Sequence, residues 1–184
     1  MIIFIHGFSS HGYGGKAKML RSYFSDKEED FIAPSLSYVP ELAIQTLEEL
    51  ITVCDDVKLI GSSLGGYYAM YLAEKYKLKV VLINPAMHSD KTLNRMLGQA
   101  PNFYDGSLFE WKVSHLEMLK QYETDMTDQS KVMLMVQKGD DVLDYRVAVN
   151  KLPHAKQIVE EGGDHGFTGV EKYFDEIRLF LKKS

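Results

Sequence analysis

The sequence predicts an α/β fold built on a mostly parallel sheet of about six strands, with helices on both faces. Two observations predict this class. Short apolar runs alternate with amphipathic stretches, which is the pattern of parallel strands joined by right-handed helical crossovers. The length of 184 residues suits one hydrophobic core, because chains usually divide into domains well above this size. We therefore expect a single domain over residues 1–184.

The first part of the chain alternates as this fold requires. Residues 2–5 form a continuous apolar run, as expected for a strand buried on both faces. A helix through residues 19–24 and a second strand over residues 31–34 follow. Residues 40–51 then open on a Pro-Glu pair suited to a first helical turn and carry an apolar stripe, which predicts a crossover helix.

The third expected strand, over residues 57–60, ends in Gly61-Ser62-Ser63-Leu64-Gly65 and runs directly into a helix. G-x-S-x-G in this context is the nucleophile elbow of α/β-hydrolases, which makes the expected fold an α/β-hydrolase fold. Such a turn strains the backbone of Ser63 and leaves no space for side chains at the flanking glycines. It also aims the amide of Leu64 at the place where an oxyanion would form. The alternative is a glycine-rich loop with a solvated serine.

The later part of the chain returns to the same alternation. Strands are expected over residues 80–83, 131–137 and 157–160, each a short apolar run. The last helix is expected to begin at a capping box that starts with Thr168. Its apolar face would contain Val170, Phe174, Ile177 and Leu181.

The alternation lapses over about residues 85–131. Apolar and polar residues alternate from Phe109 to Val113, which predicts a short extended segment. A capping box at Ser114 then predicts the start of a helix. We expect this insertion to form a small lid or wall over the site; the alternative is a satellite helix that closes the sheet edge.

A second oxyanion donor is expected just after the first strand. His6-Gly7-Phe8 stands where α/β-hydrolases place the other half of the oxyanion hole, so the amide of Phe8 is the candidate donor. We interpret the His6 ring as a structural spacer rather than a catalyst. The following glycine-rich stretch reaches Gly15-Lys16, but it lacks the glycine and hydroxyl positions of a phosphate-binding loop.

The candidate acid and base follow the serine in the chain order of this fold. His165 is the candidate base. The run that starts at Asp140 follows a late strand, where the triad carboxylate belongs, and it resembles the common hydrolase pattern D-x-V-V-P-Y. We therefore choose Asp140, with Asp141 second. Asp164 is the weakest candidate, because it adjoins His165 in the chain, and we interpret it as shaping the loop.

Together these residues predict nucleophilic catalysis without a metal. A serine hydroxyl needs a base within hydrogen-bond reach, and a carboxylate that orients this base. Ser63, His165 and Asp140 supply those groups, whereas no short-spaced set of metal ligands occurs in the sequence. We expect neither a metal nor a cofactor.

Composition indicates a small-molecule partner. The formal net charge of −5 is mild, and the basic residues are scattered, so we expect neither nucleic acid nor membrane as a partner. The single cysteine, Cys54, forms no intramolecular disulfide, and the apolar N-terminal run is too short for a signal peptide. We expect a cytoplasmic protein that is a monomer or a weak homodimer.

The chain resembles the small bacterial α/β-hydrolases called YqiA-like esterases over nearly its whole length. The resemblance is carried by five motifs: residues 6–10, residues 61–67, Asn84-Pro85-Ala86, residues 139–146 and residues 161–165. It implies hydrolysis of short-chain carboxylic esters, with thioesters as an alternative, and no cofactor. The chain departs from the family at His11-Gly12-Tyr13-Gly14, where a proline-containing turn is expected, so the rim near the oxyanion hole is expected to differ.

Two classes of function are consistent with these residues. The first is a serine hydrolase that cleaves carboxylic esters through an acyl-enzyme on Ser63; an acyltransferase or a peptidase could use the same triad. The second is a hydrolase-fold binding protein without turnover. An intact set of serine, histidine and aspartate favours the enzyme, because a binding protein has no need of a base and its orienting carboxylate.

Overall fold

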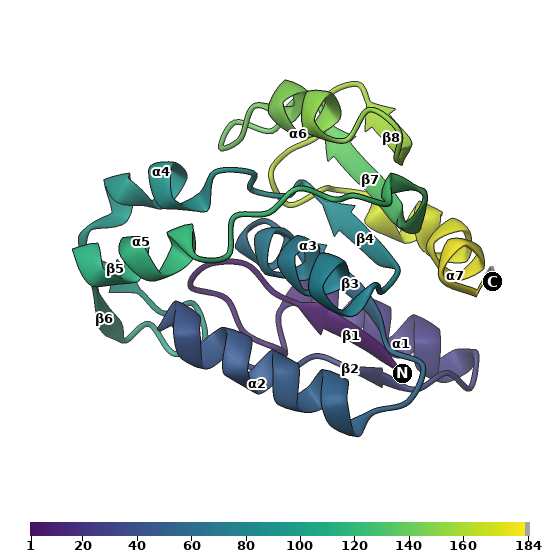
Figure 1. The fold of residues 1–184 in the computed structure, drawn as a ribbon, viewed down its shortest axis with the longest axis horizontal. Coiled ribbons are helices and arrows are strands. Elements are labelled where there is room, and N and C mark those ends of the chain that lie inside the picture. Colours follow the sequence, from purple (N-terminus) through teal and green to yellow (C-terminus); the bar gives the residue numbers. More distant parts are fainter. Residues whose placement is uncertain (183–184) are drawn as a thin grey trace.

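The computed structural model describes residues 1–182 and confirms the α/β-hydrolase architecture (Figure 1). Within these residues the main sheet has six strands, all parallel, in the order β2-β1-β3-β4-β7-β8. The strands are β1 (Ile2–Ile5), β2 (Phe31–Ile32), β3 (Lys58–Ser62), β4 (Val80–Ile83), β7 (Val132–Gln137) and β8 (Lys156–Glu160). Each expected strand is present, although β2 is two residues long instead of four.

Helices cover both faces of this sheet. In the described part of the chain the α-helices are α1 (Gly15–Asp26), α2 (Pro40–Val53), α3 (Leu64–Tyr76), α4 (Ser89–Leu93), α5 (Val113–Lys120), α6 (Tyr145–Lys151) and α7 (Phe174–Lys182). Three short 3₁₀ turns join them, namely η1 (Asn94–Met96), η2 (Gln129–Lys131) and η3 (Val170–Tyr173).

The side chains of β1 show how one strand serves two cores. Ile3 and Ile5 pack with α2 and α3 on one face, whereas Ile2 and Phe4 pack with α1 and α7 on the other. Successive residues of a strand point to opposite faces, so a continuous apolar run is required where both faces are covered. The same alternation continues through β3, β4 and β7. The apolar runs of the sequence therefore predict the strands well.

The insertion between β4 and β7 forms a helix, a hairpin and a second helix. The expected extended segment is β6 (Leu108–Trp111), and it pairs antiparallel with β5 (Gly98–Pro101), a strand that we did not expect. Trp111 and Ala100 anchor this hairpin because both are buried in the core with α5. In Figure 1 the insertion lies at the left, beyond the carboxyl ends of β3 and β4.

Both expected capping boxes are wrong. Helix α5 begins at Val113 rather than after Ser114, and its capping contact is the amide of Lys112, which donates to Nδ1 of His115. Thr168 caps no helix: its hydroxyl donates to the carboxylate of Asp164. A charged carboxylate is a stronger acceptor than a neutral group, so it attracts this hydroxyl. The chain then turns at Gly169 and forms η3 before α7 begins. The predicted apolar face of the last helix is nevertheless buried.

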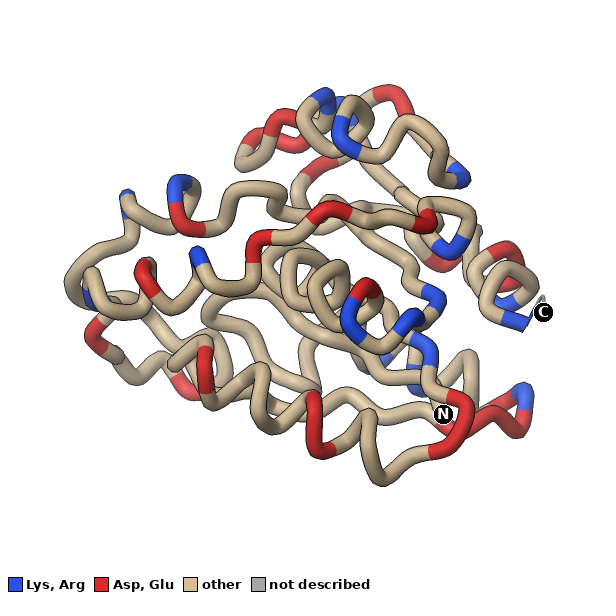
Figure 2. The backbone as a smooth tube through the Cα atoms, in the orientation of Figure 1, with Lys and Arg blue, Asp and Glu red and all other residues tan. Residues whose placement is uncertain are grey.

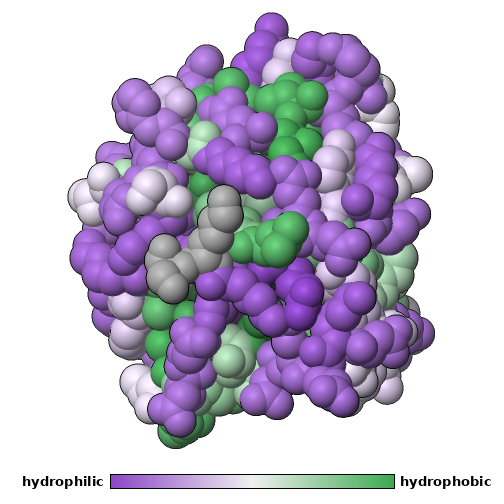
Figure 3. Space-filling view, turned by 90° about the vertical axis from the view of Figure 1, so that its right-hand side faces the viewer, coloured by the Kyte–Doolittle hydropathy of each residue, from purple (hydrophilic) through white to green (hydrophobic). Residues whose placement is uncertain are grey.

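The molecular surface is mixed in charge. Figure 2 shows acidic and basic residues interspersed along the chain. The end of the molecule that faces the viewer in Figure 3, to the right in Figure 1, is mostly hydrophilic with small apolar areas. Over residues 1–182, no helix is both long enough and apolar enough to cross a membrane.

Candidate active site

The site is organised around a tight turn between β3 and α3. Ser63 links the two elements with φ 56° and ψ −122°, a conformation that a non-glycine residue adopts only under strain. Two glycines make the turn possible, because they allow α3 to begin immediately beside β1. A side chain at Gly65 would overlap the carbonyl oxygen of Ile5, and one at Gly61 would overlap the carbonyl oxygen of Gly65. Ser63 therefore stands at the carboxyl edge of the sheet, as the sequence predicts.

Three side chains that are distant in the sequence form a hydrogen-bonded chain. Ser63 Oγ lies 3.0 Å from His165 Nε2, and His165 Nδ1 lies 2.8 Å from Asp140 Oδ2. Nδ1 donates to the carboxylate, which leaves Nε2 free to accept the serine hydroxyl. The Asp140 side chain is only 2% exposed. Its other oxygen accepts from the amides of Val142 and Leu143, at 2.8 and 2.9 Å, so the carboxylate is held from both sides.

The other aspartates near the site have different partners. Asp141 is exposed and does not contact His165. Asp144 accepts from the amide of Arg146 at the start of α6 and forms an ion pair with its side chain. Asp164 accepts from the amide and hydroxyl of Thr168, which matches the loop-shaping role that we expected. The structure thus brings Asp140, and none of these three, to His165.

Two buried polar residues that are not among the predicted site residues hold the loop that carries His165. Asn84 follows β4 with φ 40°; its Nδ2 donates to the carbonyls of Asp164 and His165, and its Oδ1 accepts from the amide of Gln137. Gln137, the last residue of β7, accepts from the amide of Asp164 and donates to the carbonyl of Thr168. A polar residue at the carboxyl end of a buried apolar run was the available signal: Asn84 directly follows β4, and Gln137 is the last residue of β7.

The two expected oxyanion donors lie beside Ser63. Leu64 is the first residue of α3, and a first-turn amide has no acceptor within its own helix. Phe8 follows Gly7, whose Cα approaches Ser63 so closely that an added Cβ would lie 3.1 Å from the serine Cβ. Phe8 and Leu64 both line the two cavities described below. Both residues therefore lie at the junction of the two cavities, next to Ser63.

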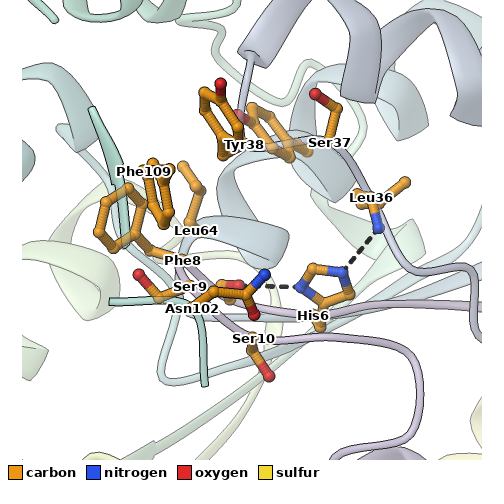
Figure 4. A pocket seen from close by; sticks show the side chains of 12 residues that line it. His6, Phe8, Ser9, Ser10, Leu36, Ser37, Tyr38, Leu64, Asn102 and Phe109 are labelled. Carbon is orange, nitrogen blue, oxygen red and sulfur yellow. Dashed lines mark hydrogen bonds between the residues drawn. The ribbon is translucent and has the colours of Figure 1, made fainter. Parts of the chain in front are cut away.

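His6 has a structural environment (Figure 4). Its Nε2 accepts from the amide of Leu36 at 3.0 Å, and its Nδ1 donates to the carbonyl of Gly7 at 2.9 Å. Burial lowers the pKa of the imidazole, because it disfavours the charged form. A neutral His6 thus ties the segment after β1 to the segment after β2. The two histidines within the insertion, His88 and His115, line neither cavity.

Two cavities meet at the segment after β1, where Gly7 and Phe8 line both. The larger, of about 420 Å³, contains Ser63 and His165 and is otherwise mainly apolar. The smaller, of about 250 Å³, shares Phe8 and Leu64 with it and extends toward Tyr38 and Phe109, whose rings stack at 4.5 Å (Figure 4). The insertion forms part of both, through Leu93, Met96 and Phe103 in the larger cavity and through Asn102 and Phe109 in the smaller.

Comparison with known proteins supports this architecture. An uncharacterised protein family, UPF0227, matches residues 1–182. A UPF0227 protein of Vibrio campbellii is 24% identical over 186 residues, covering 98% of each chain. Mouse alpha/beta hydrolase domain-containing protein 10 has a TM-score of 0.79 at 16% identity, covering 98% of this chain and 88% of its own. Est1E from Butyrivibrio proteoclasticus, with ferulic acid bound, has a TM-score of 0.74 at 14% identity, with 97% and 87% covered.

The tight contact at the elbow predicts an unusual effect of alanine. In most helices Gly→Ala is stabilising, but Gly65→Ala should lower the free energy of unfolding by about 2 kcal/mol or more, because the methyl group would displace β1 from α3. Gly15→Ala is the matched control, since nothing lies within 4 Å of its added Cβ at the start of α1. Chemical denaturation measures both variants. Equal stability of the two would contradict the close approach.

Proposed function

The chain belongs to the UPF0227 family, and we propose that it is a serine hydrolase that cleaves carboxylic esters through an acyl-enzyme on Ser63. The observation that carries this proposal is the chain of hydrogen bonds from Asp140 through His165 to Ser63, which opens on a cavity of about 420 Å³. A carboxylate that is almost fully buried against an imidazole has a clear use when that imidazole must become positively charged during a reaction. Thioesters, which react by the same steps, are an alternative class of substrate.

In the proposed reaction Ser63 Oγ attacks the ester carbonyl carbon while His165 Nε2 accepts the hydroxyl proton. The amides of Phe8 and Leu64 donate to the oxygen of the tetrahedral intermediate. Asp140 keeps the imidazole in the required tautomer and stabilises its protonated form. His165 then gives the proton to the leaving alcohol, and the acyl group remains on Ser63. Water then attacks the acyl carbon while the same histidine accepts its proton. The bond to Ser63 Oγ breaks, His165 returns the proton to Oγ, and the carboxylic acid leaves.

The smaller cavity supports a preference for short acyl chains. Its volume of about 250 Å³ lies below the range typical of drug-sized ligands. It adjoins the proposed oxyanion donors, and Leu36, Tyr38 and Phe109 give it apolar walls. A short acyl chain that enters it would be buried against these walls. We therefore propose that this cavity receives the acyl group.

Labelling tests the nucleophile. A fluorophosphonate should add its phosphonyl group to the wild-type protein once, because only an activated serine attacks phosphorus rapidly. Ser63→Ala should abolish both the mass shift and the hydrolysis of p-nitrophenyl butyrate. Ser62→Ala, a change one residue away, should retain the adduct. Intact-protein mass spectrometry measures all three, and an adduct that persists in Ser63→Ala would refute the assignment.

Substitution of adjacent aspartates tests the acid. Asp140→Asn should lower kcat by roughly 10²- to 10⁴-fold, because an amide cannot orient and stabilise the imidazole as a carboxylate does. Asp141→Asn should stay near the wild-type value, since this side chain is exposed and away from His165. Steady-state kinetics on p-nitrophenyl butyrate, with folding checked by circular dichroism, compares them. The reverse result would move the acid to Asp141.

Acyl-chain length tests the smaller cavity. From p-nitrophenyl acetate to butyrate, kcat/KM should rise, because each buried CH₂ contributes about 0.8 kcal/mol; from butyrate to decanoate it should rise no further. Tyr38→Ala should extend the rise to longer chains, since Tyr38 lines the cavity. Tyr13→Ala, an exposed tyrosine that lines neither cavity, is the control. A wild-type kcat/KM that climbs steadily to decanoate would overturn the assignment.

A further inference from the structure

The cavity above Ser63 is lined by basic ionisable side chains without acidic ones. Among residues 1–182, Lys16, Arg95 and His165 line it, and no Asp or Glu does. This distribution differs from the chain as a whole, which has 26 acidic and 21 Lys and Arg residues. A cleft with low-dielectric walls and one sign of charge concentrates the opposite sign. The local composition therefore favours an anionic ligand in a protein of net negative charge.

Lys16 reaches this cavity from the first turn of α1. Its Nζ donates to the carbonyl of Gly166 at 2.6 Å, so the amine lies next to the residue that follows His165. A carbonyl takes one of the three ammonium hydrogens and supplies no formal charge, which leaves donors for a ligand. Burial lowers the pKa of Lys16 to about 8, and the ammonium form still predominates at neutral pH.

Neither Lys16 nor Arg95 forms an ion pair with a carboxylate of the described chain. Within the described chain, no Asp or Glu oxygen comes within 4 Å of the charged nitrogens of Lys16 or Arg95. Asp140 and Asp164 are the acidic groups that act on Lys16 at longer range. The first is engaged with His165 and two amides, and the second with Thr168. Lys16 is thus a cation in the cavity without an ion-pair partner of its own.

We propose that the site selects esters whose leaving alcohol carries a negatively charged group. Lys16 would bind this group, and Arg95 would lie at the cavity mouth. The proposal rests on the serine-hydrolase function proposed above. The leaving side is assigned by position. His165 must give its proton to the leaving oxygen, and Lys16 lies against the residue after it. The acyl side would extend the other way, into the smaller cavity between Phe8 and Tyr38.

A pair of esters of similar shape tests this selectivity. In 4-acetoxybenzoate and 4-acetoxybenzamide the acetyl group is the same, and the leaving phenol differs chiefly in its charge. The wild-type protein should show a kcat/KM ratio of benzoate to benzamide roughly tenfold above that of Lys16→Met, as expected for one charge-assisted hydrogen bond. Lys16→Arg should keep most of the wild-type preference for the benzoate. Lys18→Met removes an exposed lysine of the same helix that lies outside both cavities, and it should leave the ratio unchanged.

The pH dependence of the same ratio provides a second readout. A lysine loses its charge as the pH rises through its pKa, so the preference for the benzoate should be full near neutral pH, about half lost near pH 8, and absent well above it. His165, Asp140 and Asp164 also face Lys16, and Arg95 lines the same cavity, but these groups are common to both substrates. Their titration therefore largely cancels in the ratio. In Lys16→Met the ratio should not change over this range.

The outcomes separate the two proposals. If Lys16→Met lowers kcat/KM equally for both esters, Lys16 only supports the His165 loop and the selectivity proposal is overturned. The same conclusion follows if the wild-type ratio equals that of Lys16→Met. If the wild-type protein hydrolyses neither ester and Ser63 forms no fluorophosphonate adduct, the serine-hydrolase function itself fails. Adduct formation together with an unselective ratio would overturn the selectivity alone.

Discussion

The close approach of α3 to β1 is the constraint on which the rest of the site depends. Gly65 and Gly61 have no side chains, so the helix can begin where β3 ends without overlapping the neighbouring backbone. Ser63 must then turn the chain at a positive φ of 56°. Such a conformation costs about 1–3 kcal/mol and persists only where the surrounding structure determines it. Here the packing of α3 on the central strands holds Ser63 in this conformation. The strain is located at the one residue whose hydroxyl must stand above the sheet.

A second constraint fixes the position of the loop that carries His165. His165 lies on a loop, and loops are usually mobile, but Asn84 and Gln137 bind that loop from the ends of two neighbouring strands. Both side chains are buried, and several of their polar atoms have partners. A satisfied polar network in a low-dielectric interior favours one arrangement strongly, because any displacement leaves a donor or acceptor unpaired. The imidazole is thereby held between Ser63 and Asp140.

The sequence predicted the elements that are marked by runs of apolar residues and failed where a side chain had another partner or a strand had no apolar run of its own. The strands of the main sheet were recognised because both of their faces are covered, so their side chains are almost all apolar. The capping boxes at Ser114 and Thr168 failed for another reason: the pattern of a hydroxyl residue followed by Glu is common, and His115 and Asp164 offered other contacts. Strand β5 escaped notice because Gly98 and Gln99 are exposed, and only its partner β6 makes it a strand.

By itself, then, the sequence determined the α/β class, the glycine-flanked elbow around Ser63, and an aspartate and a histidine that follow this serine in loops after later strands. These properties follow from the periodicity of short segments and from steric limits within one turn. The local motif also ranked Asp140 before Asp141, and the structure places Asp140 against His165. Only the tertiary structure decided that Asn84 and Gln137 hold the loop of His165, and that Lys16 reaches Gly166, 150 positions away in the chain. Contacts of this kind depend on the direction of side chains in loops that meet at one edge of the sheet, and no local pattern encodes that direction.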